Sequence, residues 1–181
     1  MRPRRYSTEA IILSRKSYGE ADRILTVYSK HYGKVQLLAK GVRYPKSRKR
    51  GHIEVFSLIR FSAAHGKHLD LITEAETLDS FEKVRKELKK VAVAYHLVDV
   101  VKMTTAFEEK NEKLFEIAMN YLNLLKTATQ LRKLRHMFIK DCLVLLGFWP
   151  LGKDLTDPDK ILEKITERRV SSIRVGKKLL Q

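Results

Sequence analysis

The sequence has few of the features that mark secreted, disulfide-rich or membrane-spanning proteins. Its 181 residues include four prolines and one cysteine, Cys142, which cannot form an internal disulfide. Cys142 lies in an apolar helical pattern, so we predict a core thiol in a reducing cytoplasm rather than a catalytic nucleophile. No apolar run approaches the length of a membrane span. The basic start MRPRRY precedes only the short apolar run AIIL, so we expect no export signal.

Catalytic motifs are also absent from the sequence, which has no nucleophile elbow, Walker loop or GxGxxG run. Two scattered groups resemble metal ligands: the acids Glu20, Asp22, Glu74 and Glu76, and the loop histidines His52, His65 and His68. Acids beside Arg23 in a tight turn more often fix that turn than bind the metal of a nuclease. Of the histidines, His65 and His68 share one loop and His52 is only nearby in sequence, so a metal site there would need a third ligand and ordered partners. We therefore predict a binding protein that is not an enzyme and uses no metal or other cofactor.

Negative charge is scarce, because 21 Asp and Glu residues face 37 Lys and Arg residues. The formal net charge of +16 and a pI near 10.0 favour an acidic partner. Nucleic acid, an anionic membrane surface and an acidic protein tail all satisfy that condition, and charge alone does not choose among them. The length and the 44% apolar content allow one large core or two small ones.

Positive charge is concentrated between Arg23 and Ile53, which contain nine Lys or Arg residues and no acid. Gly41, Pro45 and Gly51 exclude a strand interior over 41–51, so this segment is predicted to be an exposed loop. Uncompensated cations favour phosphate backbones, which release counterions on binding. The alternative is a solvated, partly mobile loop that keeps the protein soluble. The predicted DNA-binding residues are Arg15, Lys16, Lys34, Lys40, Arg43, Tyr44, Lys46, Arg48, Lys49 and Arg50.

Tyr44 is the aromatic residue of this loop. Its ring can stack on an unpaired base, which would add a sequence-tolerant contact to the electrostatic ones. It is equally well explained as an ordinary surface aromatic.

The first part of the chain reads as five short strands separated by turn residues. The predicted strands span 8–14, 23–29, 34–40, 53–61 and 68–76. About seventy residues leave no room for crossover helices, which indicates an antiparallel barrel or sandwich. We expect a five-stranded OB-type barrel, with an SH3-like barrel as the topological rival.

From Ser80 the apolar period changes from two to about 3.6. Helical patterns cover 80–101, 111–127 and 130–148, and Thr156 or Asp157 is suited to cap a further short helix. The predicted class is α+β. An OB-fold domain over 1–79 is followed by an antiparallel helical bundle over 80–181, which ends in a basic tail.

Four segments occur in a specific order: YGEADR at 18–23, GK at 33–34, AKG at 39–41 and LGFWP at 146–150. Through these four ordered segments, about the first 150 residues of the chain resemble the bacterial RecO family of recombination-mediator proteins. The resemblance implies an N-terminal OB-fold followed by a helical domain. It also implies binding of single- and double-stranded DNA, annealing of complementary strands, and action with RecR and the single-stranded-DNA-binding protein to load recombinase onto gaps.

The sequence departs from the family after the LGFWP segment. Many members carry a four-cysteine zinc module there, whereas this chain continues LGKDLTDPDK without cysteine. A zinc site of that type is excluded, and we expect a short form of the family. Partner contacts that the family makes through its C-terminal part are not implied for this chain.

One further site is suggested near the last predicted bundle helix. Trp149 can line an apolar groove beside the cations Arg132, Lys133, Arg135 and Lys140. The resemblance suggests that such a groove captures the acidic, hydrophobic-ended tail of the single-stranded-DNA-binding protein. The alternative is that Trp149 is part of a packed core.

Two other functions fit the same charge. An RNA-binding OB-fold chaperone would use identical electrostatics. A scaffold whose basic surface recruits acidic proteins would need no nucleic acid. The leading prediction remains a DNA-binding recombination mediator in the cytoplasm, associated with the nucleoid and not with a membrane.

Overall fold

A computed structural model describes residues 4–167, which form two compact units. The first unit contains the described residues up to Ser80 together with Ala106–Glu112. The second contains Phe81–Thr105 and the described residues from Lys113 onward. A segment from the middle of the chain therefore belongs to the N-terminal unit. The two units are described separately.

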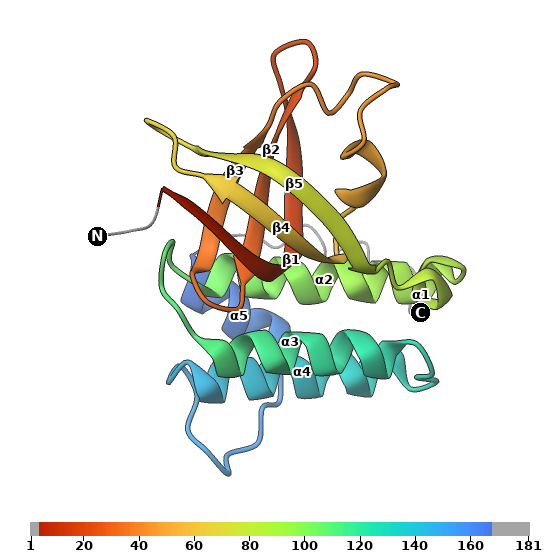
Figure 1. Ribbon diagram of the computed structural model, residues 1–181. Coiled ribbons are helices and arrows are strands. Elements are labelled where there is room, and N and C mark those ends of the chain that lie inside the picture. The colour runs from red at the N-terminus through yellow and green to blue at the C-terminus, as the bar shows by residue number, and fades with distance from the viewer. Residues whose placement is uncertain (1–3, 168–181) are drawn as a thin grey trace. The chain divides into compact units, whose positions relative to one another are not determined.

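The first unit is a closed barrel of five strands (Figure 1). The strands are β1 (Arg5–Tyr18), β2 (Asp22–Ser29), β3 (Gly33–Ala39), β4 (Leu58–Ala64) and β5 (Asp70–Asp79). They follow the order β1-β2-β3-β5-β4, and β4 closes the barrel by pairing antiparallel with β1. Among these five barrel strands, β3 and β5 pair in parallel and the other pairs are antiparallel. This arrangement confirms the expected OB-type barrel rather than the SH3-like rival.

Alternating apolar residues of these strands fill the barrel. Leu25 and Val27 of β2 are fully buried, as are Leu37 of β3 and Ile59 of β4. The long β1 pairs with both β2 and β4, and its register with β2 shifts between Ile12 and Ser14. Such an irregularity bends a strand, which allows β1 to serve both sides of a small barrel.

The predicted strand over 53–61 is wrong in its first half, because β4 begins only at Leu58. The preceding residues make a turn in which Phe56 has a φ of 56°. The N–H of Phe56 donates to the carbonyl of Ile12 at 2.8 Å, and the N–H of Ile12 donates to the carbonyl of Ser57 at 3.1 Å. Val55 and Phe56 are both buried although they are adjacent, so this apolar turn packs into the core without strand alternation.

The second unit is helical. Its elements are α1 (Glu82–Arg85), α2 (Leu88–Thr104), α3 (Glu112–Leu125, whose first residue belongs to the barrel unit), α4 (Leu131–Leu145) and α5 (Pro158–Thr166). The N-cap position of the first helix is not held by Ser80, where the helical pattern begins. Phe81 holds that position with a φ of 54°, and it is fully buried. No helix within residues 4–167 is both long and apolar enough to span a bilayer.

The helices of this unit differ in how much of their circumference is buried. α2 buries residues around most of its circumference, including His96, whereas α3 and α4 each bury one stripe.

α5 begins at Pro158, and the N–H of Lys160 donates to Asp157 Oδ1 at 3.1 Å. Of the two expected caps, Asp157 is therefore the one used.

Candidate nucleic-acid interface

The basic loop over 40–52 is fixed to the barrel where it begins. The N–H of Gly41 donates to Asp22 Oδ1 at 2.7 Å, and the N–H of Arg43 donates to the carbonyl of Ala21 at 2.9 Å. Arg43 Nη1 also lies 3.4 Å from the carbonyl oxygen of Gly19. Asp22 thus organises the chain around the β1–β2 turn, which is the role expected of an acid beside Arg23.

The loop is also fixed where it ends. Lys49 Nζ donates to the carbonyl of Ile72 at 3.2 Å. The N–H of Thr77 donates to His52 Nδ1 at 3.2 Å, which ties the short 3-10 helix η1 (Arg50–His52) to β5. Between the two anchors, the N–H of Ser47 donates to the carbonyl of Tyr44 at 3.0 Å. The loop is therefore a series of hydrogen-bonded turns that holds its side chains in defined places.

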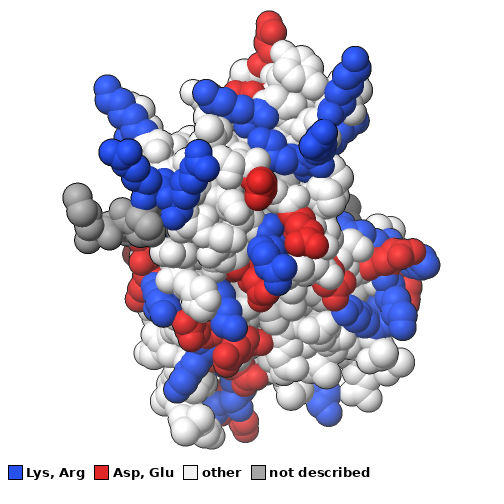
Figure 2. All heavy atoms as spheres, viewed as in Figure 1, with Lys and Arg blue, Asp and Glu red and all other residues white. Residues whose placement is uncertain are grey.

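Most predicted DNA-binding residues are exposed on this surface. Figure 2 shows mainly Lys and Arg side chains on the part of the barrel around the β1–β2 turn and the loop. Tyr44 is 60% exposed. The exposed cations are Lys16, Lys40, Arg43, Lys46, Arg48 and Arg50. Arg15 and Lys49 are half-buried.

Lys34 differs from the prediction, because its side chain is only 6% exposed. Its Nζ lies 4.7 Å from the centre of the Phe107 ring, a cation–π contact. Its carbonyl accepts the N–H of Glu108 at 2.9 Å. Lys34 therefore stabilises the fold and is not available as a surface cation.

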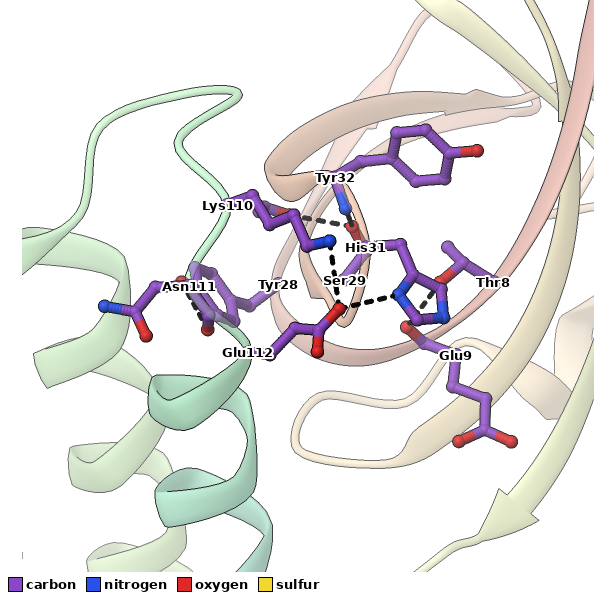
Figure 3. A network of polar contacts seen from close by, with 10 residues as sticks. Thr8, Glu9, Tyr28, Ser29, His31, Tyr32, Lys110, Asn111 and Glu112 are labelled. Atoms are coloured by element: carbon purple, nitrogen blue, oxygen red, sulfur yellow. Dashed lines mark hydrogen bonds and ion pairs between the residues drawn. The ribbon is translucent and has the colours of Figure 1, made fainter. Parts of the chain in front are cut away.

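The segment Ala106–Glu112 packs on the barrel at the β2–β3 turn (Figure 3). Tyr28 Oη donates to the carbonyl of Asn111 at 3.3 Å. Glu112 Oε1 lies 3.0 Å from Lys110 Nζ and 3.1 Å from His31 Nδ1. The hydrogen bond from Lys110, followed by that from His31, lowers the pKa of the Glu112 carboxyl below its usual value. Nothing in the local pattern of 106–112 predicted this docking.

Arg23 is a residue of the basic surface that the predicted site omitted. It pairs with Ser17 across the β1–β2 hairpin, and Arg15 lies two residues from Ser17, so both arginines project from the same face. Burial, and then the charge of Arg15, lowers the pKa of Arg23. The charges of Arg43 and Arg50 also lower the pKa of Arg23, whereas the charge of Glu54 raises it. An arginine remains charged under such conditions, so Arg23 adds a cation to the basic surface beside Arg15.

In the helical unit, several of the predicted tail-binding residues have internal partners. Arg135 makes an ion pair with Asp159, and both side chains are mostly buried. Lys140 Nζ lies 3.8 Å from Asp154 Oδ1. Trp149 Nε1 donates to the carbonyl of Lys153 at 3.2 Å. Arg135 therefore serves the internal structure, whereas Arg132 and Lys133 remain exposed on α4.

An apolar groove that the sequence did not reveal lies between α3 and α4. Its volume is about 530 Å³, and its lining includes Ile117, Tyr121, Leu124, Leu134, Met137 and Lys133. Leu124 and Met137 are each about half exposed. Tyr121 Oη donates to Asp141 Oδ2 at 2.5 Å. Trp149 is not among the lining residues, so the predicted groove and the observed one differ in position.

The histidines, acids and cysteine considered for metal binding or catalysis form no such site among the described residues. Within residues 4–167, no three His, Cys, Asp or Glu side chains gather to hold a metal ion. His65 Nδ1 lies 2.9 Å from Asp70 Oδ1. Cys142 is buried, as expected, and burial raises the pKa of its thiol far above neutral. A thiol in this state is a poor nucleophile.

Comparison with known proteins finds matches to a single protein family, and these matches extend over both units. Residues 1–81 match the family described as "Recombination protein O N terminal". The chain is 34% identical over 146 residues to "DNA repair protein RecO" of Pelotomaculum thermopropionicum, covering 81% of this chain and 57% of the relative. The protein of that name in Desulforamulus reducens is 34% identical over 166 residues, covering 92% and 63%. The Roseiflexus sp. protein is 32% identical over 168 residues, covering 93% and 59%. The matched part of the chain thus spans about three fifths of the length of these relatives.

Proposed function

The chain belongs to the RecO family, and from this we propose that it acts in DNA repair as a recombination mediator that binds single- and double-stranded DNA without sequence preference. The supporting observation is the anchored loop over 40–52, which presents exposed cations beside the β1–β2 turn of an OB-type barrel. Barrels of this type bind oligonucleotides through strand faces and connecting loops.

The proposed mechanism is electrostatic. The phosphate contacts are Lys16, Lys40, Arg43, Lys46, Arg48 and Arg50, with Arg15, Arg23 and Lys49 at the edge of the surface. Tyr44 stacks on an unpaired base. Holding two complementary strands against one cationic surface reduces their mutual repulsion and raises their local concentration. Annealing then requires no nucleotide hydrolysis, so the protein acts as a binding protein and not as an enzyme.

The proposed partners follow from family membership. The protein acts with RecR and with the single-stranded-DNA-binding protein to load recombinase, in the cytoplasm at the nucleoid. The acidic tail of the latter protein binds the helical unit, where its apolar end enters the α3–α4 groove and its carboxylates meet Arg132 and Lys133. An apolar groove with cations at its rim suits such a peptide.

The salt dependence of binding tests the role of the loop. The double variant Lys46→Ala/Arg48→Ala should bind a fluorescent single-stranded oligonucleotide more weakly. Its log–log salt slope should be less steep by about 1.4, because each lost phosphate contact accounts for about 0.7. The control is Lys83→Ala/Lys113→Ala, which removes two exposed lysines of the helical unit and should leave the slope unchanged. Equal slopes for the wild-type protein and the loop variant would remove the loop from the mechanism.

Competition separates the proposal from the other two functions. Matched DNA and RNA oligonucleotides should compete with similar affinity, whereas a strong preference for RNA would favour an RNA chaperone. A protein that ignores oligonucleotides at low salt but binds an acidic peptide would be a scaffold. A fluorescence assay of strand annealing, on bare and protein-coated strands, tests the mediator activity directly.

A further inference from the structure

One carboxylate lies beside the arginines of the β1–β2 hairpin. Glu54 makes an ion pair with Arg15 through Oε1 and Nη1. Its negative charge also raises the pKa of Arg23, against the effects of burial and of Arg15. The side chains of Arg15 and Glu54 are 30% and 45% exposed, so solvent and solutes reach the pair. The pair lies at the edge of the surface proposed to bind phosphates.

The backbone holds Glu54 firmly at this point. Glu54 opens the turn before β4, where the N–H of Ser57 donates to the carbonyl of Glu54 at 3.1 Å. The neighbouring Phe56 is fully buried and is hydrogen-bonded to Ile12 of β1. Since Arg15 belongs to the same strand β1, the carboxylate and the guanidinium group are held on connected, rigid backbone.

The chemistry of these arginines suits a phosphate as well as a carboxylate. Guanidinium groups bind both anions through charge-assisted hydrogen bonds. Arg15 and Arg23 come from the β1–β2 hairpin, and Arg43 and Arg50 come from the basic loop. Arg15 and Arg23 project from the same face of the hairpin, so one carboxylate paired with Arg15 leaves an excess of positive charge there.

We propose that Arg15 and Arg23 form a binding site for one phosphate group, and that the Glu54 carboxylate occupies this site in its place until a phosphate displaces it. The inference rests on the proposed function, which supplies the phosphate from a nucleic-acid backbone. Glu54 then lowers the affinity for the strand, and it re-forms its ion pair with Arg15 as a phosphate leaves. Such competition accelerates strand release, which annealing requires.

The isosteric variant Glu54→Gln tests this proposal in the full chain. It should bind a single-stranded oligonucleotide about two- to fivefold more tightly, as expected for loss of a partly exposed ion pair that competes with the ligand. Its salt slope should become steeper by about 0.7, because Arg15 gains one phosphate contact. The control Glu74→Gln changes the same charge at an exposed position of β5 and should alter the affinity less, without changing the slope.

A double-mutant cycle and a second ligand complete the test. In an Arg15→Gln background, Glu54→Gln should no longer tighten binding. In calorimetric titration, inorganic pyrophosphate should bind Glu54→Gln more tightly than Glu74→Gln. If both variants bind every ligand alike while the wild-type protein binds oligonucleotides, the inference fails and the proposed function stands. If no protein binds oligonucleotides but pyrophosphate still prefers Glu54→Gln, the proposed function fails and the phosphate site stands.

Discussion

His96 is a buried titratable residue in the middle of α2, with 1% of its surface exposed. Burial, and then the nearby charge of Arg135, lowers its pKa to about 3 from an ordinary value of 6.5. The imidazole is therefore neutral in the folded protein at any pH above about 3. Because the unfolded chain binds the proton near pH 6.5, acid favours unfolding through this residue.

The stability of the protein should accordingly fall as the pH drops below about 6.5, by at most about 1.4 kcal/mol per pH unit from His96. Above pH 6.5 the residue should contribute no pH dependence. Urea denaturation at pH 7 and pH 5 measures the difference, which His96→Gln should reduce and the exposed control His68→Gln should not. An unchanged pH dependence in His96→Gln would show that His96 is not protonated on unfolding in this range.

At the scale of elements, the docking of Ala106–Glu112 on the barrel depends on a glycine. Gly33 opens β3 with a φ of +67°, and a Cβ at this position would lie 2.1 Å from the carbonyl oxygen of Glu109. Gly19 has a similar φ of +57° with no atom within 4 Å of the corresponding Cβ. Alanine substitution at these two glycines therefore distinguishes backbone strain, which both would show, from steric conflict, which only Gly33 would show.

Gly19→Ala should therefore cost about 1 kcal/mol through its left-handed backbone alone. Gly33→Ala should cost at least about 1 kcal/mol more, since the docked segment must move. Denaturation measures both losses. Hydrogen exchange at the Glu108 N–H, which bonds to the Lys34 carbonyl, should accelerate only in Gly33→Ala. Equal losses and unchanged exchange would mean that the segment adjusts without leaving the barrel.

At the scale of the whole molecule, the net charge of +16 opposes folding through repulsion among like charges. Raising NaCl from about 0.02 to 0.2 M shortens the range of these interactions from roughly 20 to 7 Å. The midpoint of thermal unfolding should therefore rise. A neutral solute at matched osmolality serves as the control and should give a smaller change. A midpoint that stays constant or falls with NaCl would show that ion pairs outweigh the net repulsion.

Local pattern predicted the existence of five strands, because alternation and turn residues act over a few neighbours. It failed where partners are distant in the chain. Phe56 packs into the core as part of a turn, and Arg135 pairs with Asp159 across the helical unit. A charged residue in a sequence does not disclose whether its partner is water, a ligand or a buried acid. The α3–α4 groove was missed for the same reason, since two helices must meet before a groove exists.

The sequence by itself determined the charge, the exposed basic loop between Gly41 and Gly51, the five-stranded class and the resemblance to the RecO family. These properties depend on composition, short-range periodicity and ordered motifs. Only the tertiary structure decided which cations face solvent. Lys34 is covered by a segment some seventy positions away, and Arg23 lies on the same face of the β1–β2 hairpin as Arg15, which pairs with Glu54. The physical reason is that burial and charge pairing depend on distance in space, which strand pairing sets and local sequence does not.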